Sequence, residues 1–258
     1  MCDGKIWIYK NTVLVTDPPD SQRFDAVLPL CHENRFLVEH MDVPADGTVL
    51  DLCTGSGVLA VFAAQKALDV VGVDINPRAI EFAKLNSQLN ALDHKTEWMV
   101  GDLFEPVKGR RFDAILANPP FEPTQIDRTN YLHSDGGEDG LTVIRKIISQ
   151  VPEYLAGHGS FQMMAWLSPQ SVSAVDGLRA FFGADRVVVR SLFAFPLADY
   201  LSHQRQKHKR LSVTDSLKKT SDLLHYVYIH VLPTKASFRT QMEVYQIGKA
   251  ISTSGTVI

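Results

Sequence analysis

Between residues 48 and 117, short apolar runs alternate with longer segments whose apolar residues recur at helical spacing. Apolar runs of this length fit buried strands, and the segments between them fit crossover helices, as in repeated βα units on a parallel sheet. The expected strands are Thr48–Leu52, Val70–Asp74, Glu97–Val100 and Phe112–Ala117. The expected helices are Val58–Leu68 and Pro77–Asn90, the second with Asn76 as its N-cap and Pro77 at its first position.

The alternation continues after Gly140. Apolar residues at helical spacing from Ile144 to Leu155 predict a helix, which Gly157 and Gly159 are expected to end. The other expected elements are a strand at Ser160–Trp166, a helix at Ser168–Gly183, strands at Arg186–Phe193 and Leu224–Leu232, a hairpin of Ile6–Tyr9 with Val13–Val15, and a short helix at Glu33–Met41. The pattern therefore predicts an α/β fold.

Composition and charge add exclusions. The chain has 258 residues, of which 45% are hydrophobic and 21% charged, and its mean hydropathy of -0.04 is that of an ordinary globular protein. A net charge of -3 argues against a protein that wraps long nucleic acid, although a local basic patch would still allow such binding. The three cysteines have no metal-ligand spacing, so we expect no disulfide framework and no metal site. We see no export signal or membrane span and expect a cytoplasmic protein without a membrane partner.

Polar side chains and glycines gather where the expected strands end. The run Asp51-Leu52-Cys53-Thr54-Gly55-Ser56-Gly57 takes the first strand into a glycine turn that opens a helix, and such a turn lets a ligand approach the backbone closely. Asp74 ends the second strand, where a carboxylate can accept hydrogen bonds from both hydroxyls of a ribose. Asp102 follows the third strand, where its carboxylate can accept a hydrogen bond from an adenine amine. These positions predict an adenosine site.

A nicotinamide dinucleotide site is the nearest alternative. The run Gly55-Ser56-Gly57-Val58-Leu59-Ala60 also fits the dinucleotide fingerprint, with an acidic residue roughly 20 positions further on. However, Asp51 lies just before the turn, and a carboxylate there suits a cationic sulfonium and an amino group better than a pyrophosphate. The loop after the fourth strand also argues for a methyl donor.

That loop is Asn118-Pro119-Pro120-Phe121. The two prolines stiffen it, because each fixes its own φ, lacks an N–H and restricts the residue before it. The Asn118 side-chain oxygen and the Pro119 carbonyl are two acceptors that match the two N–H bonds of an amide or an aromatic amine. Accepting both bonds would stabilise the positive charge that develops on such a nitrogen during methylation, and Phe121 would pack on the flat face of the acceptor.

Residues Val27 to Trp166 resemble the class I S-adenosylmethionine-dependent methyltransferases. Within these, the loop resembles that of the HemK-like N5-glutamine methyltransferases and the related N6-adenine enzymes, which share an N-P-P-Y/F sequence. The resemblance implies a Rossmann-like α/β fold, in which a mostly parallel seven-stranded sheet carries helices on both faces and its last strand is antiparallel. It also implies that S-adenosyl-L-methionine binds and that S-adenosyl-L-homocysteine is the product.

The family's motifs carry over to particular positions. The turn from Asp51 to Gly57 would bind the methionine part of the cofactor, Asp74 the ribose and Asp102 the adenine, and Cys53 stands where many members have glycine. The full set expected to bind the cofactor is Asp51, Cys53, Thr54, Gly55, Gly57, Asp74, Ile75, Asp102, Leu103 and Asn118. The loop Asn118, Pro119, Pro120 and Phe121 is expected to be catalytic, and His32, Arg35, Phe121 and Glu122 are expected to bind the acceptor.

The expected domain organisation has two parts. Residues 1–45 form an extension on the substrate side, and residues 46–258 form the catalytic domain, which includes an inserted basic arm at 196–222. The run Asp135-Gly136-Gly137-Glu138-Asp139-Gly140-Leu141 resembles the glycine-rich entry to the helix after the catalytic loop, where the family uses it to support the site.

We expect an N-methyltransferase that acts on a planar or amine nitrogen of a peptide, a protein side chain or a specialised metabolite. One alternative is an RNA or DNA methyltransferase that modifies the N6 of adenine or the N2 of guanine. Another is a nucleotide-binding Rossmann protein without methyl transfer. The partner would be a small-molecule, peptide or protein acceptor, with nucleic acid as the second possibility, and the sequence leaves the oligomeric state open.

Overall fold

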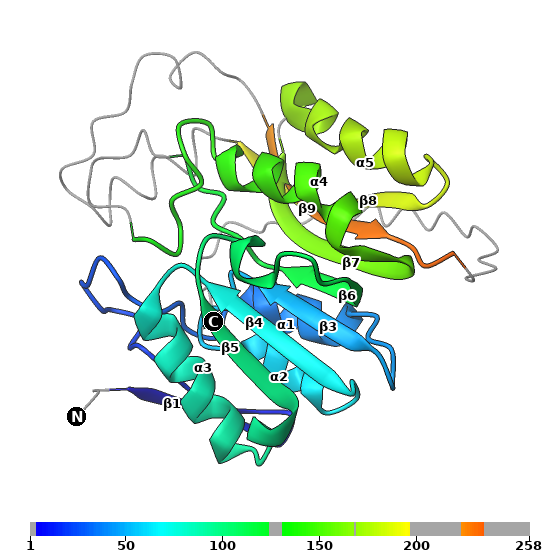
Figure 1. Ribbon diagram of the computed structural model, residues 1–258. Coiled ribbons are helices and arrows are strands. Elements are labelled where there is room, and N and C mark those ends of the chain that lie inside the picture. The colour runs from blue at the N-terminus through cyan, green and yellow to red at the C-terminus, as the bar shows by residue number, and fades with distance from the viewer. Residues whose placement is uncertain (1–3, 124–130, 168, 197–222, 235–258) are drawn as a thin grey trace.

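A computed structural model describes residues 4–123, 131–167, 169–196 and 223–234 (Figure 1). Its centre is a seven-stranded sheet in the order β5-β4-β3-β6-β7-β9-β8. The strands are β3 (Thr48–Leu52), β4 (Asp69–Asp74), β5 (Thr96–Val100), β6 (Phe112–Ala117), β7 (Leu155–Leu167), β8 (Val187–Pro196) and β9 (Leu223–Val231). Strand β9 runs antiparallel to both of its neighbours, whereas β3 to β7 pair in parallel. The expected sheet, with its antiparallel last strand, is confirmed.

Helices cover both faces of this sheet, as expected (Figure 1). On one face lie α1 (His32–His40), α2 (Val58–Ala64) and α3 (Pro77–Leu89), and on the other α4 (Thr142–Tyr154) and α5 (Asp176–Phe182). Short 3-10 helices form η1 (Asp93–Lys95), η2 (Glu105–Val107) and η3 (Pro169–Val175). The N-cap of α3 is Asn76, whose side-chain oxygen accepts a hydrogen bond from the Arg78 backbone N–H at 3.0 Å, also as expected.

The hydrophobic core consists of two layers, because successive side chains of a strand point to opposite faces. Leu50 and Leu52 of β3 pack with the apolar residues of α4, whereas Val49 packs with α1 and α2. All three side chains are fully buried. The continuous apolar runs of the sequence therefore reflect strands that are covered on both sides. The parallel pairing of β3 to β6 places their carboxyl ends at one edge of the sheet.

The largest differences from the predicted boundaries are at three places. Helix α2 ends at Ala64 because the chain has to turn into β4, which already starts at Asp69. The glycines expected to end the helix after Gly140 instead lie inside β7, where a Cβ on Gly159 would meet the Asp113 carbonyl at 2.9 Å. The expected helix at Ser168–Gly183 divides into η3 and α5, in a segment rich in the weak helix formers serine and glycine.

The N-terminal hairpin of β1 (Lys5–Tyr9) and β2 (Thr12–Thr16) is present as a separate two-stranded sheet. It packs on α3, where Asn86 and Asn90 each donate to and accept from the backbone of β2 at 2.7 to 3.0 Å. Its Leu14 is fully buried beside residues of α2. The extension is therefore built onto the main domain by buried contacts, and its assignment to the substrate side stays a prediction.

Within the residues that the structure describes, none of the helices combines the length and the apolar character that a membrane crossing requires.

Candidate active site

The carboxyl ends of β3, β4, β5 and β6 surround a cavity of about 250 Å³, which we call the strand-end cavity. Ligands of open α/β sheets bind outside this edge of the strands. The residues predicted from the sequence that line it are Cys53, Thr54, Gly55, Asp74, Ile75, Asp102, Leu103, Asn118 and Pro120. The fold therefore brings most of the expected cofactor residues together with the first part of the expected catalytic loop.

The turn after β3 contains three residues with left-handed backbone conformation: Cys53 at φ 55°, Gly55 at φ 56° and Gly57 at φ 79°. This conformation favours glycine, which accounts for the glycine that is usual in the resembling family at the position of Cys53. A Cβ on Gly57 would meet the Trp98 and Ala83 side chains at 2.8 and 3.0 Å, so this glycine allows close packing. A Cβ on Gly55 would meet nothing within 4 Å, so the turn is open towards the cavity there.

Asp74 lies at the end of β4 with both carboxylate oxygens fixed by backbone donors. Its Oδ2 accepts from the Gly55 N–H at 2.8 Å, and its Oδ1 accepts from the Asn76 N–H at 2.9 Å. Burial raises the pKa of this carboxyl, and the bonds from Asn76 and Gly55 oppose the shift. Each oxygen keeps a further lone pair, so Asp74 can accept hydrogen bonds from a diol in the cavity.

Asp51 does not line the strand-end cavity. It is fully buried behind the turn, where its Oδ2 accepts from Thr54 Oγ1 at 2.6 Å and from the Ala60 N–H at 3.1 Å. Its Oδ1 has no hydrogen-bond partner among the described residues. Burial raises the pKa of Asp51 to about 7. The carboxylate thus holds the turn against the start of α2, and a direct contact with the cofactor stays a prediction.

Asp102 also lines the strand-end cavity. Its Oδ2 is 3.3 Å from Nζ of Lys146 on α4, and both side chains are about half exposed. Leu103, which follows it, has φ 53°, so the chain turns sharply after β5. Asp102 is therefore placed at the mouth of the cavity, where its carboxylate reaches both a lysine and the cavity space.

The Asn118-Pro119-Pro120-Phe121 loop follows β6 and separates two cavities. Asn118 and Pro120 line the strand-end cavity, whereas Phe121 lines a second cavity of about 490 Å³, the Phe121 cavity. The Asn118 Oδ1 atom is buried and finds no hydrogen-bond partner in the described part of the chain. A buried acceptor without a donor costs free energy, so this oxygen is placed for a donor from outside the chain.

The glycine-rich segment before α4 holds this loop in place. A Cβ on Gly136 would lie 2.8 Å from the Phe121 Cα, and one on Gly140 would lie 2.4 Å from the Phe121 carbonyl oxygen. The Gly136 N–H donates to the Glu122 carbonyl at 2.8 Å. The backbones approach this closely only because both residues are glycines. The segment thus contacts the loop directly, in agreement with the supporting position implied by the resemblance.

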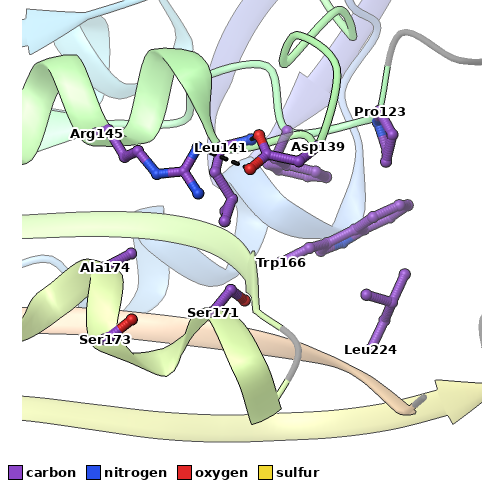
Figure 2. A pocket seen from close by; sticks show the side chains of 10 residues that line it. Pro123, Asp139, Leu141, Arg145, Trp166, Ser171, Ser173, Ala174 and Leu224 are labelled. Atoms are coloured by element: carbon purple, nitrogen blue, oxygen red, sulfur yellow. Dashed lines mark hydrogen bonds and ion pairs between the residues drawn. The ribbon is translucent and has the colours of Figure 1, made fainter. Parts of the chain in front are cut away.

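Aromatic side chains continue from the loop into the second half of the sheet. The Phe121 ring lies 4.9 Å from the Trp166 ring and 5.6 Å, edge to face, from the Tyr226 ring. Trp166 in turn lines the Phe121 cavity, together with residues of α4 and η3 (Figure 2). The predicted acceptor face of Phe121 therefore belongs to a larger aromatic wall.

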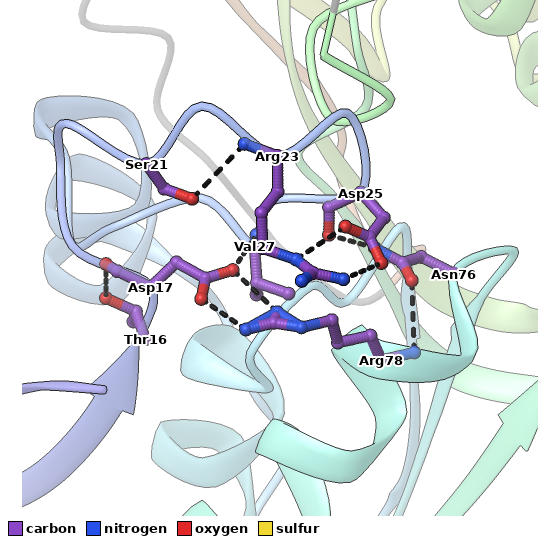
Figure 3. A network of polar contacts seen from close by, with 8 residues as sticks. All are labelled: Thr16, Asp17, Ser21, Arg23, Asp25, Val27, Asn76 and Arg78. Carbon is purple, nitrogen blue, oxygen red and sulfur yellow. Dashed lines mark hydrogen bonds and ion pairs between the residues drawn. The ribbon is translucent and has the colours of Figure 1, made fainter. Parts of the chain in front are cut away.

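Residues 17–28, which precede α1, cover part of the strand-end cavity, and we call them the roof segment. Its Ala26, Val27 and Leu28 line the cavity. Asp17 ties it down, because its carboxylate forms an ion pair with Arg78 at the start of α3 and accepts the Val27 N–H at 2.8 Å (Figure 3). The Asn76 side chain also donates to the Asp25 carbonyl at 2.9 Å. The roof segment is thus fastened to the same turn that carries Asp74.

Residues 131–135 contact the roof segment and also line the cavity. The Leu132 N–H donates to the Phe24 carbonyl at 2.9 Å, and Leu132, His133 and Asp135 all line the strand-end cavity. Burial lowers the pKa of His133 to about 4, so its imidazole is neutral at pH 7. The cavity is therefore bounded by two segments that lie far apart in the sequence.

Three residues expected to bind the acceptor line neither cavity. His32 begins α1, and the Arg35 guanidinium lies 5.6 Å from the Tyr9 ring of the hairpin. Glu122 contributes backbone hydrogen bonds to Ser134 and Gly136. Gly57 and Pro119 also lie outside the cavity linings. The contribution of His32, Arg35 and Glu122 to acceptor binding stays a prediction, and the basic arm beyond Pro196 lies outside the described residues.

The sequence analysis did not identify several residues of the site. These are Ala26, Val27, Leu28, Leu132, His133 and Lys146 on the cavity walls, and Asp17 of the roof segment with its ion-pair partner Arg78. Lys146 could have been identified from the sequence, because it lies on the exposed face of α4, about one turn after the glycine-rich segment. The roof segment has no periodicity, so nothing in its own sequence indicated its position.

Comparisons with known proteins agree with this geometry. Residues 32–192 match the methyltransferase small domain. Over 121 residues the chain is 40% identical to a protein of Methanocaldococcus jannaschii named as an N5-glutamine methyltransferase, a match that covers 45% of this chain and 60% of the relative. It is also 40% identical, over 121 residues, to the ribosomal protein uL3 glutamine methyltransferase of Bradyrhizobium diazoefficiens, covering 43% of this chain and 38% of that protein.

Among solved structures, the fold is similar to that of a 16S rRNA N2 G1207 methyltransferase of T. thermophilus in complex with AdoMet and guanosine. The TM-score is 0.55 at 18% identity, and the match covers 89% of this chain and 50% of the other. At this identity the likeness shows the fold. The chain spans about half the length of the curated relatives it matches.

Proposed function

The chain belongs to the methyltransferase small domain family, and from this premise we propose that it binds S-adenosylmethionine in the strand-end cavity and methylates the nitrogen of a side-chain amide in a protein. Three features support the proposal: the cavity at the strand ends, the Asn118 oxygen that finds no donor in the described part of the chain, and the names of the relatives. The first concerns the methyl donor, and the other two concern the acceptor.

The residues of the strand-end cavity fit this cofactor. Asp74 offers two fixed carboxylate oxygens for the ribose hydroxyls, and Asp102 offers one for the adenine amine. The open side of the turn at Gly55 leaves room for a ligand against the backbone. When bound, S-adenosylmethionine supplies a methyl group on a positively charged sulfur, which makes that methyl electrophilic.

The single observation that supports the acceptor chemistry is the buried Asn118 Oδ1, which finds no hydrogen-bond partner among the described residues. An amide nitrogen is a weak nucleophile, because its lone pair is delocalised into the carbonyl. As the new N–C bond forms and the C–S bond breaks, positive charge develops on the nitrogen. Asn118 Oδ1 can stabilise this charge by accepting a hydrogen bond from one of the two N–H groups. The proton of the other N–H group then leaves to solvent. No buried general base is required if the loop fixes the nitrogen in line.

The relatives support a protein acceptor, because the two described above are named for glutamine methylation, one of them in ribosomal protein uL3. Such an acceptor is also consistent with a cytoplasmic enzyme. The alternative, an exocyclic amine of a nucleobase, would use the same Asn118 oxygen, and the fold is shared with an rRNA methyltransferase. A dinucleotide-binding protein without methyl transfer would use neither Asn118 nor the Phe121 cavity.

We also propose the catalytic domain to be residues 46–258, with residues 1–45 as an extension that covers part of the site. The hydrogen bonds of Asp17 and the lining positions of Ala26 to Leu28 support this use of the extension.

Two substitutions should separate the effect on turnover from the effect on cofactor binding, namely Asn118→Ala and Asp74→Ala. Asn118→Ala removes an acceptor that acts on the transferring nitrogen, so kcat should fall by about 100-fold to 1,000-fold while the Kd for S-adenosylmethionine changes little. Asp74→Ala removes the ribose acceptor, so that Kd should rise by about tenfold or more. Calorimetry measures the Kd, and S-adenosylhomocysteine formation with a glutamine peptide measures kcat.

Asp69→Ala is the matched control, because Asp69 is exposed at the other end of the same strand. It should leave both quantities unchanged. If Asn118→Ala keeps kcat within threefold of the wild type, Asn118 has no role at the acceptor and the proposed mechanism is wrong. If Asp74→Ala binds the cofactor as the wild type does, the cofactor does not occupy the strand-end cavity.

A further inference from the structure

The loop between the two cavities restricts how an acceptor can reach Asn118. Asn118 and Pro120 face the strand-end cavity, and Phe121 faces the other one. Under the proposed function, on which this inference rests, the cofactor fills the strand-end cavity. The acceptor then has to approach Asn118 from the side of the Phe121 cavity.

The Phe121 cavity is larger than an amide group needs. Its volume of about 490 Å³ lies within the range of roughly 300 to 1,000 Å³ that is usual for ligand pockets. A polypeptide acceptor would therefore place more than its amide there. The residues on either side of the modified one are the nearest candidates, because adjacent Cα atoms lie only about 3.8 Å apart.

Most of the lining of the Phe121 cavity is apolar. Trp166, Leu141 and Leu224 face the space from β7, the start of α4 and β9, with Pro123 beside Trp166 (Figure 2). Ala174 and the serines of η3 lie across from Leu141. Such a surface stabilises an apolar side chain that leaves water.

The charges on this lining cancel. Arg145 and Asp139 are its charged residues in the described part of the chain, and their side chains form an ion pair at 2.7 Å. Asp139 is also fixed from the other side, because its Oδ1 accepts the Leu141 N–H at 3.0 Å. Both side chains are about half exposed, so this is a surface ion pair, but an incoming anion would still have to compete with Asp139 for Arg145. The lining therefore favours a neutral guest.

We propose that the Phe121 cavity is a specificity subsite, which binds an uncharged apolar side chain next to the methylated residue of a polypeptide acceptor. Trp166 and Leu224 contact that side chain, and the Asp139–Arg145 pair excludes acidic neighbours. A nucleic acid would need cations for its phosphates, whereas the described cation of this lining is already paired.

Acceptor peptides test the subsite directly. The full chain is assayed with S-adenosylmethionine and acetylated pentapeptide amides that have a central glutamine, flanked on one side or the other by alanine, leucine, aspartate or lysine. The initial rate of S-adenosylhomocysteine formation gives kcat/KM. At one of the two flanking positions, leucine should exceed alanine by about tenfold, since each methylene in an apolar pocket contributes to discrimination, and aspartate should be the poorest acceptor.

Two substitutions make the test specific. Ala174→Trp fills the cavity from η3 and should remove the leucine preference, while Ala180→Trp, on the exposed surface of α5, is the matched control that should retain it. Asp139→Asn keeps the acceptor for the Leu141 N–H but frees Arg145. It should raise kcat/KM for the aspartate peptide by about tenfold relative to the alanine peptide, which loss of folding could not cause.

The outcomes separate the subsite from the proposed function. Equal kcat/KM for all flanking residues, or a leucine preference that survives Ala174→Trp, would overturn the subsite and leave amide methylation standing. Peptides that are never methylated, while an RNA oligonucleotide offered in parallel is, would overturn the proposed function and the subsite with it. An aspartate peptide unaffected by Asp139→Asn would overturn the role assigned to the ion pair.

Discussion

Asp51 shows how a single buried carboxyl can serve both the fold and the site. It is enclosed by the turn that it holds, with one oxygen bonded to Thr54 and Ala60 and the other without a partner in the described residues. Burial disfavours its charged form, which raises its pKa from 3.8 to about 7. At neutral pH the group is therefore poised between its two protonation states.

This shift predicts a pH dependence of stability. Between pH 4 and pH 7 the folded chain holds a proton on Asp51 that the unfolded chain has released, so the contribution of Asp51 to stability falls as the pH rises through this window. Asp51→Asn removes the titrating group and keeps one acceptor oxygen for Thr54. The free energy of unfolding of the wild type, minus that of Asp51→Asn, should fall from pH 4 to pH 7 and become flat above it.

Urea unfolding of both proteins without cofactor measures this difference at each pH. A difference that stays constant from pH 4 to pH 8 would show that Asp51 titrates normally and would contradict its burial. A difference that rises with pH would mean that the charged form is the stabilised one.

At the residue scale, the expected cofactor residues that line the strand-end cavity were predictable from the sequence, because their signals are local. Asp74 and Asn118 each end a strand that the apolar pattern marks, so their shared edge followed from the parallel sheet. Cys53 was readable only as a departure from glycine, and its left-handed φ now accounts for that position. The expected contact of Asp51 with the cofactor stays a prediction, and the structure adds that its carboxylate lies behind the turn, because sequence position does not specify the depth of a side chain.

At the scale of elements, the regular parts were predictable and the irregular parts were not. Strands β3, β4 and β6 follow from apolar runs covered on both faces, so their bounds agree within a residue. The start of β7 was missed, because its glycines resemble a helix stop but in fact lie where a backbone approaches Asp113 closely. The roof segment was missed because its position depends on an ion pair between Asp17 and Arg78, which are far apart in the sequence.

That ion pair predicts a role for the roof segment in holding the cofactor. Asp17 is buried, and its carboxylate bonds both Arg78 and the backbone of Val27, a lining residue of the strand-end cavity. Asp17→Asn weakens this attachment and leaves the Arg78 guanidinium without its counter-charge. The Kd for S-adenosylmethionine should rise by about tenfold, mainly through faster dissociation, as stopped-flow and calorimetric titrations would show.

Asp20→Asn is the matched control, with the same substitution at an exposed position of the same segment. It should bind the cofactor as the wild type does. If Asp17→Asn lowers the melting temperature but leaves the Kd unchanged, the ion pair serves stability alone and the roof segment does not contribute to binding.

At the scale of the whole molecule, the two cavities lie on either side of the Asn118–Phe121 loop. The cofactor residues come from the ends of β3 to β6, and the acceptor side is built from β7, β9, α4 and η3. The net charge of -3 gives no general attraction for nucleic acid. The basic residues from His203 to Lys219 lie outside the described residues, and the proposed acceptor rests on Asn118 and the Phe121 cavity.

The most direct test locates the transferred methyl group. The full chain is incubated with S-adenosylmethionine carrying a deuterated methyl, together with a glutamine peptide, the same peptide with glutamate in its place, and an RNA oligonucleotide containing adenine and guanine. Tandem mass spectrometry then identifies the labelled atom. We predict label on the side-chain nitrogen of the glutamine peptide and none on the glutamate peptide, whose carboxylate has no N–H for Asn118 to accept. Label on a nucleobase amine with none on the glutamine peptide would contradict the account.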